Sequence, residues 1–248
     1  MFCPSDTNDA RRSGYGTDMS GEVNPRPKDG GLSAAPFVPD TRSIARLRAA
    51  AAGCEGCPLY VDATQTVFGE RAGAAAAGRR VVMLVGEQPG NDEDLEGHPF
   101  VGPAGRLLDR ALVEAGADPS RVYRTNVVKH FRFSGTRGKQ RIHKSPSRVH
   151  VAACGPWLVA EIDVVRPTGV VLLGATAGKA VHGSGFTVGE ARGQVRPWPE
   201  QGPVTGLEHP PDWIMATVHP SSVLRSRTRE EDFDRLVADL RVAVRACA

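Results

Sequence analysis

No stretch of this 248-residue chain is apolar over the length that a lipid bilayer requires, so we expect no membrane-spanning segment. The first ten residues are polar and lack the apolar centre of a signal peptide, which predicts a cytoplasmic location. The five cysteines cannot all pair with one another, and this odd count argues against a disulfide framework. Hydrophobic residues make up 40% of the chain, which is ordinary for a soluble globular protein with a sizeable core.

Acidic residues are absent from the segment 119–160. Nine basic residues lie in the same segment, namely Arg121, Arg124, Lys129, Arg132, Arg137, Lys139, Arg141, Lys144 and Arg148. The whole chain has a formal net charge of only +3, so this segment carries +9 and the rest of the chain carries −6. Concentrated positive charge repels itself, and a bound polyanion relieves that repulsion. The pattern therefore favours a polyanionic partner over a solvated basic loop.

Two regions are predicted from composition: a disordered tail over 1–39 and one domain over 40–248. The tail is rich in Gly, Pro, Ser and charged residues and has few side chains to bury. The domain opens with a helix over 41–52, for which Asp40 is the predicted N-cap. Short apolar runs then alternate with helical patterns. Strands are predicted over 80–85, 122–128, 169–173 and 213–218, and helices over 105–115, 147–165, 175–181 and from 228 onwards.

This alternation predicts the α/β class: three α/β/α layers around a central, four-stranded and mostly parallel sheet. In such sheets the ligand site lies beyond the carboxyl ends of the strands. The segments that follow the four predicted strands are 86–91, 126–131, 174–176 and 219–222, and we expect the site among them.

Cys54 and Cys57 form a C-x-x-C pair whose thiolates can reach one metal centre. Together with Cys154 and His130 they make a set of three thiolates and one imidazole, which suits a zinc ion or an iron–sulfur cluster. The spacing alone does not choose between the two metals. Cys154 alone would be interpreted as a small buried hydrophobe.

Four motifs make the sequence recognisable. They are GEQPG at 86–90, HPFVGPAG at 98–105, TNVVK at 125–129 and HPSS at 219–222. In this order they resemble the family 4 uracil-DNA glycosylases. Gln88 and the inserted segment KQRIHKSP at 139–146 are similar to the UdgX subgroup of that family. The resemblance covers the chain from about residue 41 to the C-terminus.

The resemblance implies a [4Fe–4S] cluster, with Cys54, Cys57, His130 and Cys154 as its ligands. It also implies a flipped-out deoxyuridine in the pocket. Phe100 would stack on the base beside Gly86, and the amide of Asn126 would read uracil O4 and N3–H while rejecting cytosine. From the residues alone, the alternative for Phe100 is a core side chain, but its place in a loop rich in glycine and proline favours the pocket. The alternative for Asn126 is a turn residue at the end of a strand.

The same resemblance assigns roles to the last motif. His219 would donate a hydrogen bond to uracil O2 and stabilise the departing anion. Ser221, Ser222 and Arg225 would bind DNA phosphates near a helix start. A histidine before proline is more often structural, but its place after a strand favours the catalytic interpretation.

The subgroup resemblance makes His143 a nucleophile that attacks the sugar C1′ and leaves a covalent protein–DNA adduct. Basic surroundings would keep its imidazole neutral. Glu87 would support this step electrostatically, while Gln88 is a poor general base. Lys139, Arg141 and Lys144 would bind phosphate. Without the resemblance, His143 would be interpreted as a solvated loop residue.

Two positions depart from the subgroup pattern: Gln140 replaces the usual Arg, and Asn91 replaces the Asp that commonly follows GEQPG. Asn91 cannot accept a proton, and the acidic residues 92–94 are candidates to substitute for it. The hypothesis is a self-trapping, monomeric glycosylase that acts on uracil-containing DNA, single-stranded in preference. The alternatives are a turnover glycosylase of the family 4 type and a non-catalytic sensor of uracil in DNA.

Overall fold

The computed structural model describes residues 31–71, 80–138 and 140–247. No helix within these ranges combines the length and the apolar character needed to cross a membrane.

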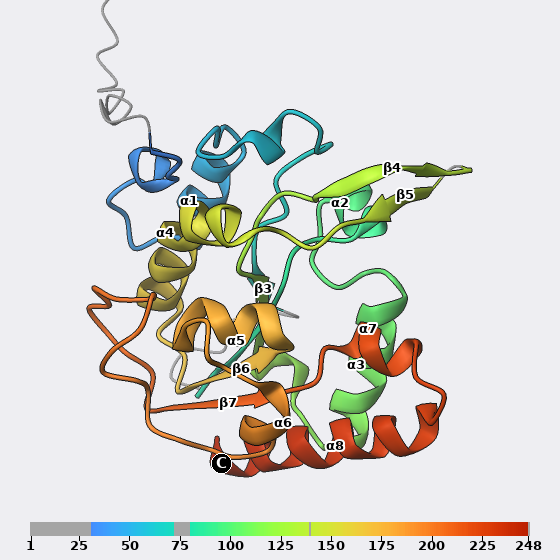
Figure 1. The fold of residues 1–248 in the computed structure, drawn as a ribbon. Helices are drawn as coiled ribbons and strands as arrows, with labels where there is room; N and C mark the ends of the chain where they lie inside the picture. The colour runs from blue at the N-terminus through green and yellow to red at the C-terminus, as the bar shows by residue number, and fades with distance from the viewer. Residues whose placement is uncertain (1–30, 72–79, 139, 248) are drawn as a thin grey trace, which may run out of the picture.

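The centre of the protein is a five-stranded sheet with the order β1-β3-β2-β6-β7 (Figure 1). The four predicted strands are present and pair in parallel, as β2 (Val82–Gly86), β3 (Val122–Asn126), β6 (Gly169–Leu173) and β7 (Trp213–Thr217). The fifth strand, β1 (Glu70–Arg71), was not predicted, because two residues are too short to give a pattern. It pairs antiparallel with β3 at the edge of the sheet.

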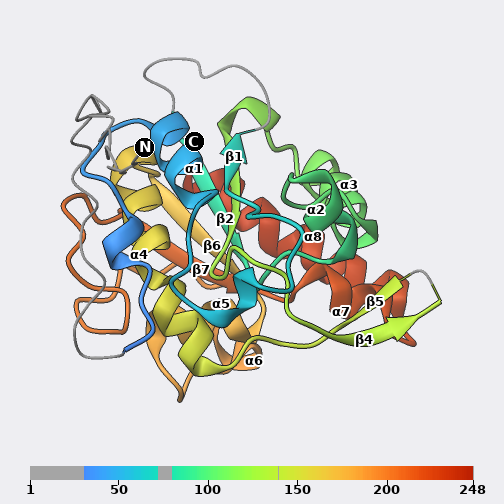
Figure 2. The same ribbon diagram turned by 90° about the horizontal axis from the view of Figure 1, so that it is seen from above.

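Helices cover both faces of the sheet, which confirms the predicted three-layer architecture (Figures 1 and 2). Alternate residues of β2 divide between two cores: Met83 and Val85 belong to one, and Val82 and Leu84 to the other. The first core packs under α1 (Ile44–Ala51), α4 (Arg148–Val165) and α5 (Ala175–His182). The second packs under α3 (Pro103–Glu114) and α8 (Arg229–Ala246). This period of two places apolar side chains on both faces, as a fully covered parallel sheet requires.

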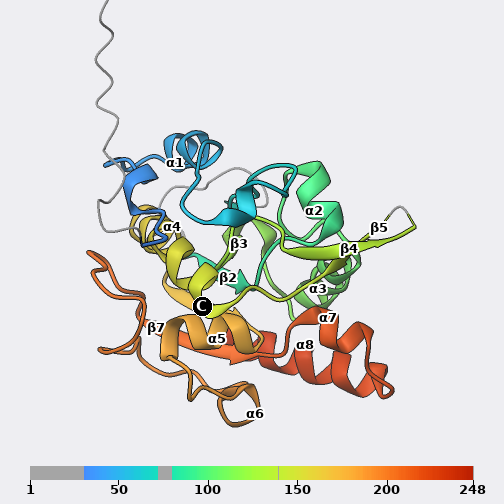
Figure 3. The same cartoon turned by 45° about the horizontal axis from the view of Figure 1, so that its top comes forward.

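Several short elements were not predicted from the sequence. They are η1 (Ala35–Phe37), η2 (Pro58–Tyr60), α2 (Asn91–Glu96), η3 (Pro119–Arg121), α6 (Val188–Ala191) and α7 (Pro220–Leu224). The inserted segment 139–146 contributes β5 (Gln140–His143), which pairs antiparallel with β4 (Phe133–Arg137) to form a hairpin. This hairpin extends away from the body of the domain beside α2 (Figures 1 and 3).

The start of the domain differs from the prediction. Residues 31–39 were expected to belong to the tail, yet Ala34 is buried and its N–H donates to the Ala153 carbonyl at 2.7 Å. Gly56 allows this close packing, because a Cβ atom there would lie 2.7 Å from the Cα of Ala34. The N-cap of α1 is Ser43, not Asp40, and its hydroxyl accepts the N–H of Arg46. Residues 1–30 of the predicted tail lie outside the described residues.

Candidate active site

A cavity of about 620 Å³ opens at the carboxyl ends of the parallel strands. All four segments that follow the predicted strands contribute to its wall, as the strand-end rule predicts. The site residues from the sequence that line it are Glu87, Gln88, Asn91, Phe100, Asn126, His143, His219, Ser221 and Arg225. Residues separated by more than 130 positions in the chain therefore line the same cavity.

Three residues predicted to bind the base lie against one another, and two of them, Phe100 and Asn126, line this cavity. A Cβ atom on Gly86 would lie 2.3 Å from Asn126 Oδ1 and 2.8 Å from Phe100 Cζ. Glycine is therefore needed here for lack of space. Asn126 is buried, and no described residue forms a hydrogen bond with its side-chain amide. An amide held in a pocket without a protein partner is available to a ligand.

Phe100 has a left-handed backbone with φ of 61°, which is unusual for a bulky residue. The chain is held there by Gly105 of α3, where a Cβ atom would lie 1.8 Å from the Phe100 carbonyl oxygen. Strain of this kind persists only where the surrounding structure enforces it, and it clusters at functional sites. The Phe100 side chain packs in the second core and also lines the cavity.

A buried network of charged side chains holds the backbone of Asn126 in place. Lys129 Nζ donates to the Asn126 carbonyl at 2.7 Å and forms an ion pair with Glu161 of α4. Glu161 is fully buried, and it also accepts hydrogen bonds from Tyr123 and Thr125. Sequence reasoning missed this network, because a single acidic residue within an apolar helix gives no sign of its partner.

His219 has its ring fixed by the turn that begins α7. Its Nδ1 accepts the backbone N–H of Ser221 at 3.1 Å and lies 2.8 Å from the Ser221 hydroxyl. The ring also stacks near Phe100, with centroids 6.5 Å apart. Burial lowers the pKa of His219 to about 4, with smaller contributions from His143 and Arg225. The neutral ring therefore carries its proton on Nε2 and can act as a hydrogen-bond donor there.

His143 ends β5 and is half-exposed at the mouth of the cavity. Its Nε2 lies 3.6 Å from Glu87 Oε1, and the other oxygen of Glu87 accepts the hydroxyl hydrogen of Thr176. The pKa of His143 is lowered mainly by burial, with a further lowering by Arg225, while Glu87 opposes both. The sequence prediction of a lowered pKa agrees with this direction, but desolvation is the larger cause rather than basic surroundings.

Gln88 bridges the two ends of the hairpin segment. Its Oε1 accepts the N–H of Arg132 at 3.2 Å, and its Nε2 lies 3.0 Å from the Arg132 carbonyl and 3.2 Å from the Lys144 carbonyl. Nε2 is also 3.0 Å from Nε2 of His143. These contacts make Gln88 a residue that positions the hairpin, which is consistent with its weakness as a base.

Two acidic residues of α2, Glu93 and Asp94, are engaged by backbone amides or by a basic side chain. Glu93 accepts the N–H groups of Gly90 at 3.0 Å and Gly102 at 2.8 Å, and so joins two of the recognisable motifs. A Glu three residues after a helix N-cap is the sequence signal that could have found this contact. Asp94 pairs with Arg141. Only Asp92 both lines the cavity and lacks such a contact with a backbone amide or a basic side chain among the described residues.

The predicted phosphate-binding residues do not all face the cavity. Ser221 and Arg225 line it, whereas the Ser222 hydroxyl donates to the His219 carbonyl at 2.7 Å. Arg141 has its guanidinium turned inward onto Asp94, contrary to the expectation that it binds DNA. Lys144 is exposed beside the cavity mouth, and Lys139 lies outside the described residues.

The four predicted metal ligands are all buried near the start of α4. Burial raises the pKa of Cys154 to about 12, and Cys57 and Cys54 make smaller contributions in the same direction. Two N–H groups donate to sulfur: Trp157 Nε1 to Cys54 and the Lys129 amide to Cys154, both at 3.3 Å. Such bonds stabilise thiolate or cluster sulfur.

His130 follows the Lys129 amide directly, and its Nε2 lies 2.9 Å from the Thr66 hydroxyl. Burial lowers its pKa to about 4, so the imidazole is neutral, as a ligand must be. In the described ranges, no three His, Cys, Asp or Glu side chains are gathered tightly enough to hold a single metal ion. A cluster with several iron atoms is larger than one ion, and it binds each ligand at a different iron atom. The buried donors, three sulfur atoms and one neutral imidazole, are of the types that an iron–sulfur cluster binds.

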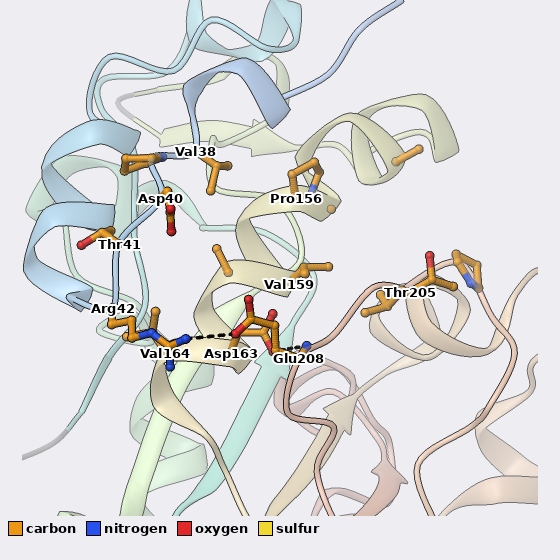
Figure 4. A pocket seen from close by; sticks show the side chains of 16 residues that line it. Val38, Asp40, Thr41, Arg42, Pro156, Val159, Asp163, Val164, Thr205 and Glu208 are labelled. Carbon is orange, nitrogen blue, oxygen red and sulfur yellow. Dashed lines mark hydrogen bonds and ion pairs between the residues drawn. The ribbon is translucent and has the colours of Figure 1, made fainter. Parts of the chain in front are cut away.

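A second cavity, of about 530 Å³, lies between α4, the segment 38–42 and the segment 203–208 (Figure 4). An exposed ion pair between Arg42 and Glu208 crosses its edge at 3.4 Å. Asp163 of α4 accepts the Glu208 N–H at 2.8 Å. None of the described residues that line it was predicted as a site residue, and no group with an evident catalytic arrangement is present among them.

Comparison with known proteins agrees with the motifs. The sequence profile of the Uracil DNA glycosylase superfamily matches residues 74–241. The chain is similar to the Type-4 uracil-DNA glycosylase of Thermotoga maritima, with 36% identity over 183 residues that cover 71% of this chain and 81% of the relative. The Pyrobaculum aerophilum protein of the same name is 34% identical, covering 75% and 86%. The Archaeoglobus fulgidus protein of that name is 31% identical, covering 74% and 86%.

Proposed function

The chain belongs to the uracil-DNA glycosylase superfamily, and we propose that it excises uracil from DNA and then captures the abasic sugar covalently through His143. The observation that carries this proposal is the common cavity. It combines an Asn126 amide that has no hydrogen-bond partner among the described residues, a neutral donor on His219 and a second neutral imidazole on His143.

Base recognition comes first in the proposed mechanism. The flipped uracil enters between the Phe100 ring and the strand ends, where the Asn126 amide offers a donor to O4 and an acceptor to N3–H. Cytosine presents the opposite pattern at these two positions and is rejected. The buried Lys129 and Glu161 hold the Asn126 backbone, so the amide does not need to reorganise when the base arrives.

Bond cleavage follows. The N1–C1′ bond breaks with its electron pair remaining on uracil, and positive charge develops on the sugar. His219 Nε2–H donates to uracil O2 and stabilises the anion, which then takes a proton from solvent. Because the pKa of His219 is about 4, this group is a hydrogen-bond donor at neutral pH and not a strong acid.

Capture is the distinctive step. A ring nitrogen of His143 donates its lone pair to C1′ and forms an N–C bond, and the proton on its other nitrogen is released to solvent. The carboxylate of Glu87, held by Thr176, stabilises the imidazolium that forms first. Neither Gln88 nor Asn91 can take a proton from water, which disfavours hydrolysis as the competing fate of the sugar.

A denaturing gel tests the proposal directly. Incubation with single-stranded DNA containing one uracil is expected to give a heat-stable band of lower mobility. His143→Ser is expected to lose this band while free uracil accumulates, and His98→Ser, on an exposed surface histidine paired with Glu70, is expected to keep it. Many uracils released per protein would instead establish a turnover enzyme, and binding without release would establish a sensor. A double-stranded substrate run alongside tests the preference for single strands.

We further propose that Cys54, Cys57, His130 and Cys154 hold a [4Fe–4S] cluster. When bound, the cluster would join two loops to α4 and supply rigidity to the DNA-binding side, with no step of the reaction passing through it. Iron and sulfide analysis is expected to give about four of each per chain. Cys57→Ala should lower both, whereas Cys247→Ala, at a buried thiol in the other core, should not.

A further inference from the structure

We propose that the ion pair between Asp94 and Arg141 is a strut that fixes the hairpin β4–β5 in place. It thereby decides whether His143 or water captures the sugar after uracil has left. The inference rests on the covalent capture proposed above, and it assigns a positioning role to Asp94.

The acidic end of this strut is rigid. Asp94 is 0% exposed, and its two oxygens accept the Thr64 N–H at 3.2 and 2.9 Å. Its Oδ2 lies 2.8 Å from Arg141 Nη1. A fully buried carboxylate requires such compensation, because an unpaired charge in this place is strongly destabilising.

The basic end is equally well held. Arg141 Nε donates to Asn91 Oδ1 at 3.0 Å, and Nη1 donates to Thr64 Oγ1 at 3.1 Å. Its guanidinium also lies over the rings of Phe131 and Phe133, 5.2 and 5.1 Å from their centroids. A planar guanidinium makes these contacts together, whereas a lysine ammonium makes only part of them.

The hairpin needs such a strut because it has almost no core of its own. Its residues 134–137 are exposed, and an isolated two-stranded hairpin is marginally stable in water. Arg141 and His143 are two residues apart on β5 and therefore lie on the same side of the strand. Both contact Phe131, so a fixed Arg141 also fixes the imidazole over the cavity.

The acidic residue of the strut lies on α2, which is attached to the wall of the active-site cavity. Asp94 belongs to α2, and Glu93 beside it fastens α2 to Gly90 and Gly102 at the cavity wall. The pair thus sets the distance between the nucleophile and the pocket. The uracil-contacting groups on Phe100, Asn126 and His219 come from other elements. Loss of the strut should therefore spare uracil release and affect capture, since a displacement of about 1 Å costs about 100-fold in a positioned reaction.

The test measures two products in one reaction: uracil released and the share of these events that ends as the covalent adduct. Protein is used in excess over single-stranded uracil DNA, so that weaker binding does not alter the share. Asp94→Asn is expected to lower the adduct share at least about 10-fold, with uracil release within about 3-fold of wild type. Free abasic DNA, detected by alkaline cleavage, should rise accordingly.

Three further variants sharpen the result. Arg141→Lys should lower the adduct share as well, and Asp94→Asn combined with Arg141→Gln should lower it no further than either change alone. Arg137→Gln, an exposed charge on the same hairpin, should leave the share unchanged. A phosphate-binding role for Arg141 would instead reduce release and capture equally.

An unchanged adduct share in Asp94→Asn and Arg141→Lys would overturn the strut, and so would an equal fall in Arg137→Gln. Uracil release by each variant reports that it is folded, and Arg141→Lys decides the question if Asp94→Asn yields no folded protein. A wild-type reaction that releases uracil without any adduct would overturn the proposed capture itself, which is a different result.

Discussion

The Nδ1 atom of His219 accepts the backbone N–H of Ser221 at 3.1 Å, and this single contact determines the tautomer of the ring. A backbone amide can only donate, so Nδ1 must hold a lone pair and Nε2 the proton. Since burial lowers the pKa of His219 to about 4, the ring stays in this form at neutral pH. The donor expected at uracil O2 is thus in place before the substrate binds.

The first prediction concerns this donor. His219→Ala should lower the single-turnover rate of uracil release by about 100- to 1,000-fold, which is the usual effect of removing a preorganised donor to a developing anion. The affinity for uracil-containing DNA should change much less, because phosphate contacts supply most of it. His209→Ala, outside the cavity, serves as the matched control. A fall of less than 10-fold at His219 would contradict the assigned role.

The second prediction concerns space at the base pocket. Gly86→Ala places a Cβ atom 2.3 Å from Asn126 Oδ1, so the amide or the Phe100 ring must move. We expect the single-turnover rate of uracil release to fall about 100-fold, as a shift of about 1 Å in a positioned group does. Gly189→Ala changes a glycine that has open space around it and no left-handed backbone, and tests instead for the general cost of losing glycine. Equal effects in both variants would argue against a specific role for Gly86.

The parallel sheet and the location of the site were predictable because both follow from periodic patterns. The runs that became β2, β6 and β7 are short and apolar, and helices separate all four parallel strands. The strand-end rule then placed Asn126 and His219 in one cavity. Functional roles came from the motifs and not from periodicity. The position of Phe100 in a glycine- and proline-rich loop was a correct indication that it faces the cavity.

The partners of buried charges were not predictable, because they depend on distances between segments that are remote in the chain. Glu161 is 32 positions from Lys129, and Asp94 is 47 positions from Arg141. The sign of the charge on Arg141 suggested a phosphate contact, whereas its actual neighbour is decided by how the hairpin folds over α2. The hairpin itself was missed, because β4 and β5 are mostly exposed and polar and lack the apolar alternation that indicates a strand.

The third prediction concerns stability. Glu161→Ala leaves the ammonium of Lys129 buried without its carboxylate, and we expect the free energy of unfolding to fall by about 3–5 kcal/mol. Glu208→Ala breaks the exposed pair with Arg42 and should cost less than about 1 kcal/mol. Urea unfolding of the two variants beside wild type makes the comparison. Similar losses in both would mean that the Lys129 charge finds another partner.

The last prediction follows from the protonation of His143. Burial lowers the pKa of this imidazole below its ordinary value of 6.5, despite the opposing effect of Glu87. The neutral, nucleophilic form therefore predominates above pH 6.5, and it is lost only as the pH falls through the lowered pKa. We expect the rate of adduct formation to be constant between about pH 7 and 8 and to fall at lower pH as the imidazole takes up one proton.

Uracil release by His143→Ser should stay nearly constant over the same range, because His219 has a pKa of about 4 and remains neutral. Parallel pH profiles of adduct formation by wild type and of uracil release by His143→Ser make the measurement. If both declined together near pH 6.5, the titrating group would not be the nucleophile. In Glu87→Gln the opposing charge is removed, so the decline should shift to lower pH, which identifies the titrating group as the imidazole beside Glu87.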